Sequence, residues 1–459
     1  MITYDDLVAV GDDETKRIKF IRSVISQHKA SEEYEEAETA EEYLKHRNPT
    51  ISRFVKMLFT MTGARVQDTY STNFRMASNY FARFMVQINL FLLGNGINWE
   101  KEDTKNRLGT DFEDAVQKAG LYALTHGVSF GFWNYDHLDV FSLLEFAPLY
   151  DETTGALMAG VRFWQIDNAK PLRATLYEPD GYTEVIWRSG KKPEILQPKR
   201  PYMLTIRTSE ADGAEIVDGE NYPSFPIVPL YGNPYKQSEL IGIREQIDCY
   251  DLIKSGFAND MQDAAQIYWT VTNAGGMDDV DLAKFVERMH TVRAASVGDV
   301  SEAHAEAHTM EVPYASREAL LNRIERDLYR DAMALDTYNI ASGSVTATQI
   351  TAAYEPLNNK VDLYEYQVIR FVNGILTLAG IDDKPTFTRS KMINGQEEIT
   401  SLIQAAQYLS EDYVTRKALS IFGDADQTDD VLDKMTDQEA ARFGGEPEEP
   451  QKEKPTEEE

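Results

Sequence analysis

The sequence predicts an α+β fold, in which one β-rich region lies between two regions of helices. From about residue 128 to 231, short aromatic and β-branched segments such as GVRFWQI and TEVIWR alternate with turn signals such as EPDG. This pattern indicates an antiparallel sheet of about six strands. Before and after it, apolar residues recur at spacings of three and four, which is typical of helices.

Two helices are expected before the sheet. In the first, the apolar residues share one face and Gly94 and Gly96 terminate it. Its face consists of Phe74, Ala77, Phe81, Phe84, Met85, Ile88 and Phe91. The second helix covers roughly 111–126. The segment 1–60 alternates charged helix-like stretches with an acidic patch.

Three prolines, Pro226, Pro229 and Pro234, mark the exit from the β-rich region. Proline fits neither a central strand nor a helix interior, so the chain should run extended there. Ser238 is a candidate N-cap for a long helix that follows. A helix over 236–271 would be roughly 50 Å long at 1.5 Å per residue.

A return helix is expected over 317–335, after an insert over 272–316. The polar segment 336–348 contains no Lys or Arg up to Ala347. A further helix over 349–384 should be kinked or broken by Pro356. A strand near 385–393 and helices around 397–409 and 411–421 complete the pattern.

The last segment, 436–459, ends in GGEPEEPQKEKPTEEE, which contains seven glutamates, three prolines and no apolar residue. This composition predicts disorder. With 459 residues, the rest is long enough for two or three packed units.

The net charge is −30, from 76 acidic and 46 basic residues. A protein that grips DNA tightly normally presents a basic face, so either nucleic acid is absent or the contact is loose. The only cysteine, Cys249, fits a reducing compartment. The N-terminus is unlike a signal peptide, and no apolar run is long enough to span a membrane.

No catalytic, metal or cofactor motif is convincing. His304 and His308 in HAEAH could share a helix face, but the zinc-protease signature needs a glutamate directly after the first histidine. Exposed surface residues are the better interpretation. No phosphate-binding GxxxxGK[ST] occurs. Acidic neighbours of Cys249 would raise the pKa of its thiol, which argues against a nucleophile.

The helical hairpin is the more informative feature. Two helices carry apolar faces that the short insert between them is too small to cover. Such faces are buried most simply against copies of the same chain, although packing within an ordinary intrachain bundle stays an alternative.

The segment FPIVPLYGNPYKQSELIGIREQIDCYDLIKSGFANDMQDAAQIYWTV resembles the portal proteins of tailed bacteriophages with long non-contractile tails. Further similarity lies in NYFARFMVQINLFLLGNGI, SGSVTATQI, KPTFTRSKMINGQEEITSL and SEDYVTRKAL. Together these segments follow the order found in that family from about residue 70 to 435. The short insert and the first seventy residues depart from the family pattern.

The resemblance implies a ring-forming subunit of the portal fold, typically in twelve copies, at one capsid vertex of the virion. It implies an α/β wing over 1–235 with the returning strand, stem helices over 236–271 and 317–335, and a clip over 272–316. It further implies a tunnel loop over 336–348, a wing helix over 349–384 and a crown over 394–435. Double-stranded DNA would enter and leave through the central channel.

The site residues expected from the resemblance belong to the tunnel loop and to the stem. The loop residues are Thr337, Tyr338, Asn339, Ile340, Ala341, Ser342, Gly343 and Ser344. The stem acids expected to line the channel are Glu245, Asp248, Asp251, Asp260 and Asp263. Acidic walls would give sliding DNA no deep binding minimum.

The resemblance also implies partners: a terminase, a head-completion or adaptor protein, scaffold and major capsid protein, with assembly in the host cytoplasm. It implies neither a cofactor nor an enzymatic activity. Two alternatives stay open, a soluble hydrolase or transferase with an inserted helical hairpin, and a capsid-associated adaptor without a channel. An enzyme should show a cleft with perturbed titratable groups.

Overall fold

The computed structural model describes residues 2–55, 57–59, 64–67, 73–101, 103–208, 215–264, 268–272, 304–308, 314–338, 347–390, 402–422, 431–432 and 434–435. The chain divides into two compact units. The first comprises Met1–Thr337 and Tyr354–Ser390, and the second comprises Tyr338–Ala353 and Lys391–Glu459. None of the described helices is long and apolar enough to cross a membrane.

Four helices begin the first unit: α1 (Tyr4–Val10), α2 (Glu14–Lys29), α3 (Glu32–Leu44) and α4 (Pro49–Ser52). Each begins after a side chain that accepts a hydrogen bond from the first turn, namely Thr3, Asp13, Ser31 and Asn48. These caps satisfy backbone donors that have no partner inside a helix. The polar residues between the charged stretches therefore set the helix starts.

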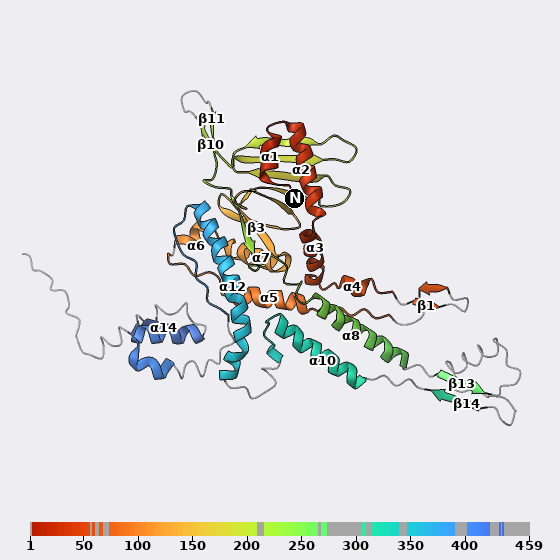
Figure 1. Cartoon of the computed structure of the whole chain (residues 1–459). Coiled ribbons are helices and arrows are strands. Elements are labelled where there is room, and N and C mark those ends of the chain that lie inside the picture. Colours follow the sequence, from red (N-terminus) through yellow and green to blue (C-terminus); the bar gives the residue numbers. More distant parts are fainter. Residues whose placement is uncertain are drawn as a thin grey trace, which may run out of the picture. The chain divides into compact units, whose positions relative to one another are not determined.

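The β-rich region is divided among separate sheets rather than forming the expected single sheet of about six strands. Five strands form one antiparallel sheet in chain order: β5 (Phe146–Tyr150), β6 (Leu157–Trp164), β7 (Leu172–Glu178), β8 (Gly181–Trp187) and β9 (Glu194–Arg200). Apolar residues of α1 and α2, including Ile21 and Val24, are buried against Val161 and Leu176 of this sheet (Figure 1).

A second sheet has the order β12-β3-β4, with β3 (Val128–Asn134), β4 (His137–Ser142) and β12 (Ile227–Tyr231). Pro229 lies in β12 opposite Phe130, so it occupies an edge strand, where a missing N–H is tolerated. Two hairpins complete the strands of this part of the chain: β1 (Met57–Phe59) with β2 (Arg65–Gln67), and β10 (Met203–Thr208) with β11 (Glu215–Glu220).

The helices before the sheet are α5 (Tyr80–Leu93), α6 (Asp103–Leu108) and α7 (Phe112–His126). The predicted apolar face of α5 is buried from Phe81 onward, and Gly94 ends the helix as expected. The helix does not reach back to Phe74, which is 48% exposed. Instead, the backbone N–H of Phe74 donates to the side chain of Asn259 and that of Met76 to the hydroxyl of Ser255, so this segment lies against the helix that contains both.

The long helix expected over 236–271 is shorter. Helix α8 covers Arg244–Ala264, and strand β13 (Tyr268–Thr272) follows it. Ser238 is not its N-cap, because its hydroxyl donates to the carbonyl of Thr125 and its oxygen accepts from the Leu240 N–H, within the turns before the helix. At 21 residues, α8 is about 32 Å long.

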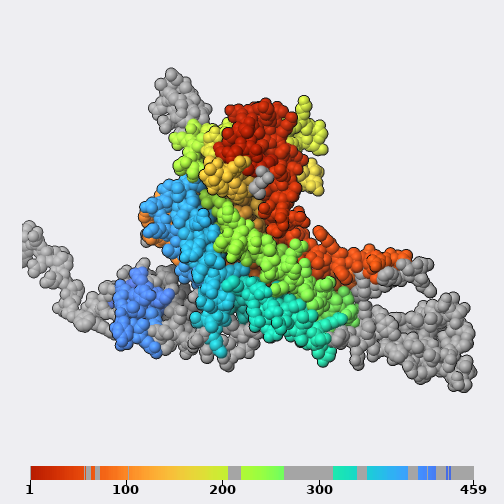
Figure 2. All heavy atoms as spheres, viewed as in Figure 1, coloured from red at the N-terminus to blue at the C-terminus, as the bar shows by residue number. Residues whose placement is uncertain are grey.

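The return helix, α10, covers Tyr314–Asp331 instead of 317–335, and it packs against α8. Figure 2 shows α8 in green and α10 in teal side by side. Within the insert, strand β14 (His304–His308) pairs with β13, so HAEAH is a strand and not a helix. The rest of the insert, residues 273–303 and 309–313, lies outside the described residues.

Helix α12 (Ala347–Ala379) continues through Pro356, so the chain does not break there. The strand expected near 385–393 is reduced, over its described residues, to a single bridge between Thr386 and Asn98. In the second unit, helix α14 (Glu411–Phe422) lies where a helix was expected, and a 3-10 turn (Ala406–Tyr408) precedes it. Residues 436–459 lie outside the described residues.

Candidate functional site

The α8–α10 hairpin is anchored at its base by an aromatic cluster. Tyr80 of α5 packs edge-on against Tyr250 of α8 at 5.1 Å and against Tyr329 of α10 at 6.2 Å between ring centroids. Arg83 donates to the hydroxyl of Tyr329 at 2.8 Å. Burial raises the pKa of Tyr80, so its hydroxyl stays protonated and neutral. The hairpin is therefore fixed to α5 at one end.

Hydrogen bonds and an ion pair hold the segment after α10, which leads toward the predicted tunnel loop. The amide of Gln87 donates to the carbonyl of Leu335 at 3.0 Å and accepts from its N–H at 2.9 Å. Lys360 of α12 donates to the carbonyl of Ala332 and forms a 2.6 Å ion pair with Glu239. Both side chains of that ion pair are about 15% exposed. Side chains of α5 and α12 therefore hold residues 332–335, which precede the predicted loop.

Of the predicted loop, only Thr337 and Tyr338 belong to the described residues, and both are exposed. Asn339, Ile340, Ala341, Ser342, Gly343 and Ser344 lie outside them. The assignment of this loop to a channel stays a prediction.

The five predicted stem acids do not share one environment. Asp251 is fully buried, and its carboxylate accepts a 2.9 Å hydrogen bond from the Asn48 amide. Burial raises the pKa of Asp251. Because its carboxylate faces the inside of this chain, Asp251 cannot line a channel, and that expectation was wrong.

Asp248 also faces the chain. Its carboxylate accepts hydrogen bonds from the Asn48 amide at 2.9 Å and the Thr50 hydroxyl at 2.8 Å, as well as from the Tyr43 hydroxyl. Burial, followed by the bond to Asp248, raises the pKa of Tyr43. Asp248 and Asp251 thus attach α8 to α3 and α4. Neither the spacing of residues nor their charge predicted this attachment of α8, although Asn48 followed by Pro49 is a recognisable helix start.

The remaining acids point elsewhere. Glu245 is exposed in the first turn of α8. Asp260 forms a 2.5 Å ion pair with Arg317 of α10, with both side chains partly exposed. The side chain of Asp263 lies outside the described residues. Glu245 and Asp260 keep their place as candidates for a channel wall.

Apolar burial decreases along the hairpin. Near its base, Ile243 just before α8, Ile247 of α8 and Leu328 of α10 are at most 3% exposed. Farther along, Leu320 of α10 is 46% exposed. Met261 is 54% exposed. The predicted apolar faces are thus covered within the chain only near the base.

The weaker candidates from the sequence are the two histidines of HAEAH and Cys249. His304 and His308 stand at opposite ends of β14, paired with Thr272 and Tyr268. Among the described residues, no group of three or more side chains could hold a metal ion. Cys249 is exposed on α8.

The structure thus combines antiparallel sheets, the helices packed on them and a helical hairpin. A family model for phage portal proteins, described as SPP1 Gp6-like, matches residues 24–442. Since this is most of the chain, the chain belongs to the phage portal protein family, which is a structural and not a catalytic family. The family prediction and the α+β prediction are confirmed.

Two relatives illustrate the similarity. The chain is 28% identical over 187 residues to the portal protein of Clostridium phage phiCD119, covering 39% of this chain and 41% of that protein. It is 21% identical over 393 residues to the portal protein of Bacillus phage SPP1, covering 75% of this chain and 73% of that protein. The chain thus spans less than half of the first relative and about three quarters of the second.

Solved structures give a weaker similarity. The neck of an empty gene transfer agent particle, computed with C6 symmetry, matches with a TM-score of 0.42 and 11% identity. The match covers 75% of this chain and 90% of that chain. A chain of the virion of the native gene transfer agent particle matches with a TM-score of 0.40 and 12% identity, over 74% and 89% of the two chains.

Proposed function

We propose that this protein forms a closed ring of about twelve copies at one capsid vertex and that double-stranded DNA passes through the ring. Membership of the portal family supports this proposal. One observation on the chain itself adds to it: apolar residues of both hairpin helices are incompletely covered, with Met261 of α8 and Leu320 of α10 about half exposed. Large apolar side chains left uncovered in one chain can be buried against a neighbouring copy.

In this proposal α8 and α10 form the stem, and the segment 336–348 narrows the channel. The chain carries a net charge of −30, so a ring of twelve would sum to roughly −360 and hold DNA only loosely. A terminase, a head-completion protein, scaffold and major capsid protein are the proposed partners. The ring has no enzymatic activity of its own, and assembly takes place in the host cytoplasm.

The mass of the purified protein tests the ring. Light scattering should give a particle of about twelve times the 52.1 kDa chain. A mass of one chain under all salt conditions, including after concentration, would contradict the proposal. Negative-stain images should show rings with a central hole.

Substitutions test which surface closes the ring. Leu320→Asp places a charge where about 1.5–3 kcal/mol of apolar burial is expected at every subunit contact. We expect monomers or small oligomers with an unchanged circular dichroism spectrum. The matched control is Ile166→Asp, which alters a side chain that is 87% exposed in the loop between β6 and β7. Complete rings of Leu320→Asp would exclude this face as the interface.

A further inference from the structure

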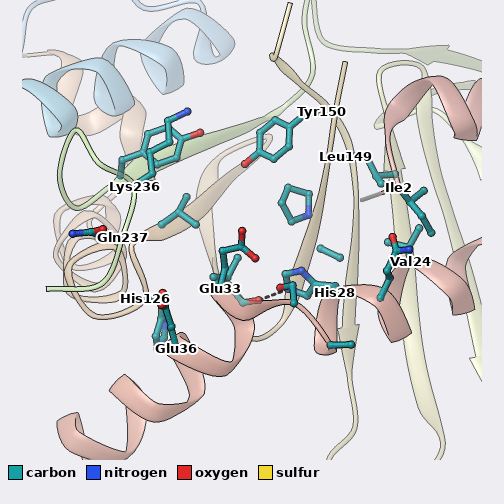
Figure 3. Close-up of a pocket in the computed structure, with 18 of the residues that line it drawn as sticks. Ile2, Val24, His28, Glu33, Glu36, His126, Leu149, Tyr150, Lys236 and Gln237 are labelled. Carbon is teal, nitrogen blue, oxygen red and sulfur yellow. Dashed lines mark hydrogen bonds between the residues drawn. The ribbon is translucent and has the colours of Figure 1, made fainter. Parts of the chain in front are cut away.

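A cavity of about 560 Å³ lies between α2, α3 and the edge strand β5 (Figure 3). Its volume is in the range of small-molecule sites. Ile2, Val24 and Leu149 form an apolar wall at one end. Pro148 of β5 also lines it, and because proline lacks an N–H, this edge is poorly suited to pairing with another strand. A small ligand therefore fits the cavity better than a β-strand.

The other end of the cavity offers carboxylates. Glu33 lies in the first turn of α3, and its carboxylate points into the cavity in Figure 3. Glu36, one turn later, is half-buried in the same lining. Burial raises the pKa of Glu36, the nearby carboxylates of Glu32 and Glu33 raise it further, and Arg244 at the start of α8 lowers it. Two carboxylates of α3 thus line one cavity.

A third acceptor comes from α7. His126, whose side chain is 1% exposed, places its Nε2 3.0 Å from the Glu41 carboxylate. In the tautomer whose Nε2–H donates to Glu41, Nδ1 is the nitrogen that can accept a hydrogen bond. Among the described residues, this buried Nδ1 has no hydrogen-bond partner. A buried acceptor without a donor is costly, so a donor supplied by a ligand would be favoured.

Aromatic side chains complete the polar end. Tyr150 and Tyr231 both line the cavity. Burial raises the pKa of Tyr150, with Tyr231 and Glu33 as further causes, which places these three groups near one another. Lys236 holds its Nζ 4.7 Å from the centroid of the Tyr231 ring. The contact with Lys236 shows that the face of the Tyr231 ring attracts a cation.

We propose that this cavity binds an aliphatic amine, with its ammonium group among Glu33, Glu36 and His126 and its hydrocarbon chain against Ile2, Val24 and Leu149. An ammonium group has three donors and no acceptor, which matches the carboxylates of Glu33 and Glu36 and the Nδ1 of His126. Its alkyl chain gains from the apolar wall. The inference is independent of the proposed ring, because every residue that it uses belongs to one chain.

Hexylamine is the probe, titrated into the full-length protein by calorimetry at neutral pH. Hexanol and hexanoate have the same chain without the cation and serve as ligand controls. We expect saturable binding of hexylamine at least tenfold tighter than that of hexanol, and no binding of hexanoate. Equal affinity for hexylamine and hexanol, or no saturable binding of hexylamine, would overturn the proposal.

Variants locate the site. Glu33→Gln with Glu36→Gln should weaken hexylamine binding at least tenfold while keeping the side-chain shapes. The matched control, Glu35→Gln, removes an exposed carboxylate of the same helix that does not line the cavity, and it should bind as the wild type does. Identical affinity of the double variant and the control would refute the site, as long as the two circular dichroism spectra agree.

The amine can belong to a free molecule or to a lysine side chain of a partner, and a second titration separates them. Acetyl-lysine methylamide carries the same cation on a chain flanked by two amide groups. Weaker binding of this derivative than of hexylamine assigns the cavity to a free amine, and tighter binding assigns it to a lysine side chain. If neither compound binds, the proposal fails.

Discussion

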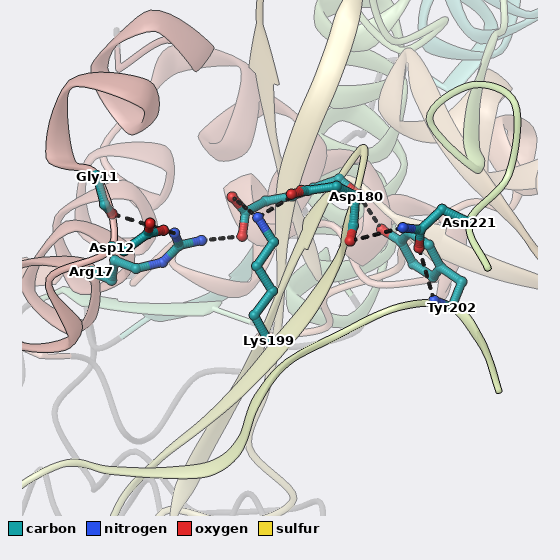
Figure 4. Close-up of polar contacts among 8 residues, drawn as sticks. Gly11, Asp12, Arg17, Asp180, Lys199, Tyr202 and Asn221 are labelled. Carbon is teal, nitrogen blue, oxygen red and sulfur yellow. Dashed lines mark hydrogen bonds and ion pairs between the residues drawn. The ribbon is translucent and has the colours of Figure 1, made fainter. Parts of the chain in front are cut away.

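A buried ion pair connects the N-terminal helices to the five-stranded sheet. Arg17 of α2 and Glu178 of β7 are in contact, and their side chains are only 11% and 8% exposed (Figure 4). Lys199 of β9 lies 3.2 Å from the same carboxylate and 2.6 Å from Asp180. Glu178 thus neutralises one guanidinium that water reaches poorly. Its removal should destabilise this part of the chain more than most single substitutions.

The size of the loss in stability depends on which charged side chain loses its partner. Glu178→Gln keeps the side-chain volume but removes the negative charge; the other contacts of Arg17 among the described residues are long, 3.4 Å to the Gly11 carbonyl and 3.5 Å to the exposed Asp12 carboxylate. Breaking a buried pair by removing one partner costs about 3–5 kcal/mol. The long contacts place the expected loss near the lower end, at about 3 kcal/mol. Lys199 keeps Asp180, so it adds little.

A double variant separates the loss of the pair from the cost of the remaining charge. Arg17→Met with Glu178→Gln removes both charges and should restore all but about 1 kcal/mol. The control is Glu194→Gln, which breaks the exposed pair between Glu194 and Arg188 on the same sheet and should cost at most about 1 kcal/mol. Both comparisons use variants that differ from the wild type by charge more than by shape.

Hydrogen exchange measured by mass spectrometry on peptides covering β6 to β8 reports the local free energy of opening. The expected order of stability is wild type and control, then the double variant, then Glu178→Gln. If Glu178→Gln behaved like Glu194→Gln, or if the double variant were as unstable as the single one, the ion pair would not be what holds α2 to the sheet.

Three further predictions concern pH, the loop and the tail. The hydrogen bonds that Glu41 accepts from His126 and Lys45 lower its pKa from 4.5 to about 2. This stabilisation, about 2 kcal/mol after allowance for solvent screening, is complete above pH 4.5 and lost as the pH falls toward 2. Urea unfolding of Glu41→Gln should therefore differ from the wild type at pH 7 and converge with it at low pH; a constant difference would contradict this. Ser342→Lys with Ser344→Lys should leave rings intact but slow DNA packaging in a salt-dependent way, because each lysine adds phosphate contacts; packaging at the wild-type rate would remove this loop from the channel. Deletion of 444–459, which contains no apolar residue, should change neither oligomer mass nor melting temperature; a shortened protein that no longer assembled would refute this.

The spacing of apolar residues predicted most of the helices correctly but placed their ends less accurately. The apolar period identified α5, α7 and α14, and the glycine at position 94 correctly marked the end of α5. The same period overextended α8 at both ends. Residues 239–243 form turns because Ser238 bonds to Thr125, more than one hundred residues earlier in the chain. A tertiary bond of this kind leaves no trace in the spacing of apolar residues.

The sequence pattern also did not show how the strands divide among separate sheets. Each predicted segment between 128 and 231 contains or overlaps a strand, yet partner choice depends on what covers each face. Strand β12 pairs with β3 and not with its neighbour in sequence, because Ile227 and Phe130 share one apolar cluster. The alternation of residues gives a strand two faces but does not identify its neighbour.

The stem acids show how charge and environment differ. On a helix, residues 251 and 260 are nine positions apart, which turns them by about 180° relative to each other. Asp251 therefore faces Asn48 inside the chain, while Asp260 reaches Arg317 at the surface. An acidic residue on an amphipathic helix is normally a solvated one, and only the position of α4 makes Asp251 an exception. Its buried carboxylate and that of Asp248 fix α8 to α3 and α4 near the base of the hairpin. With its base held by these bonds and by Tyr80, and its far end apolar and uncovered, the hairpin is stable at one end and incomplete at the other. A neighbouring copy that supplied the missing contacts would complete the packing of the hairpin without any change in its base.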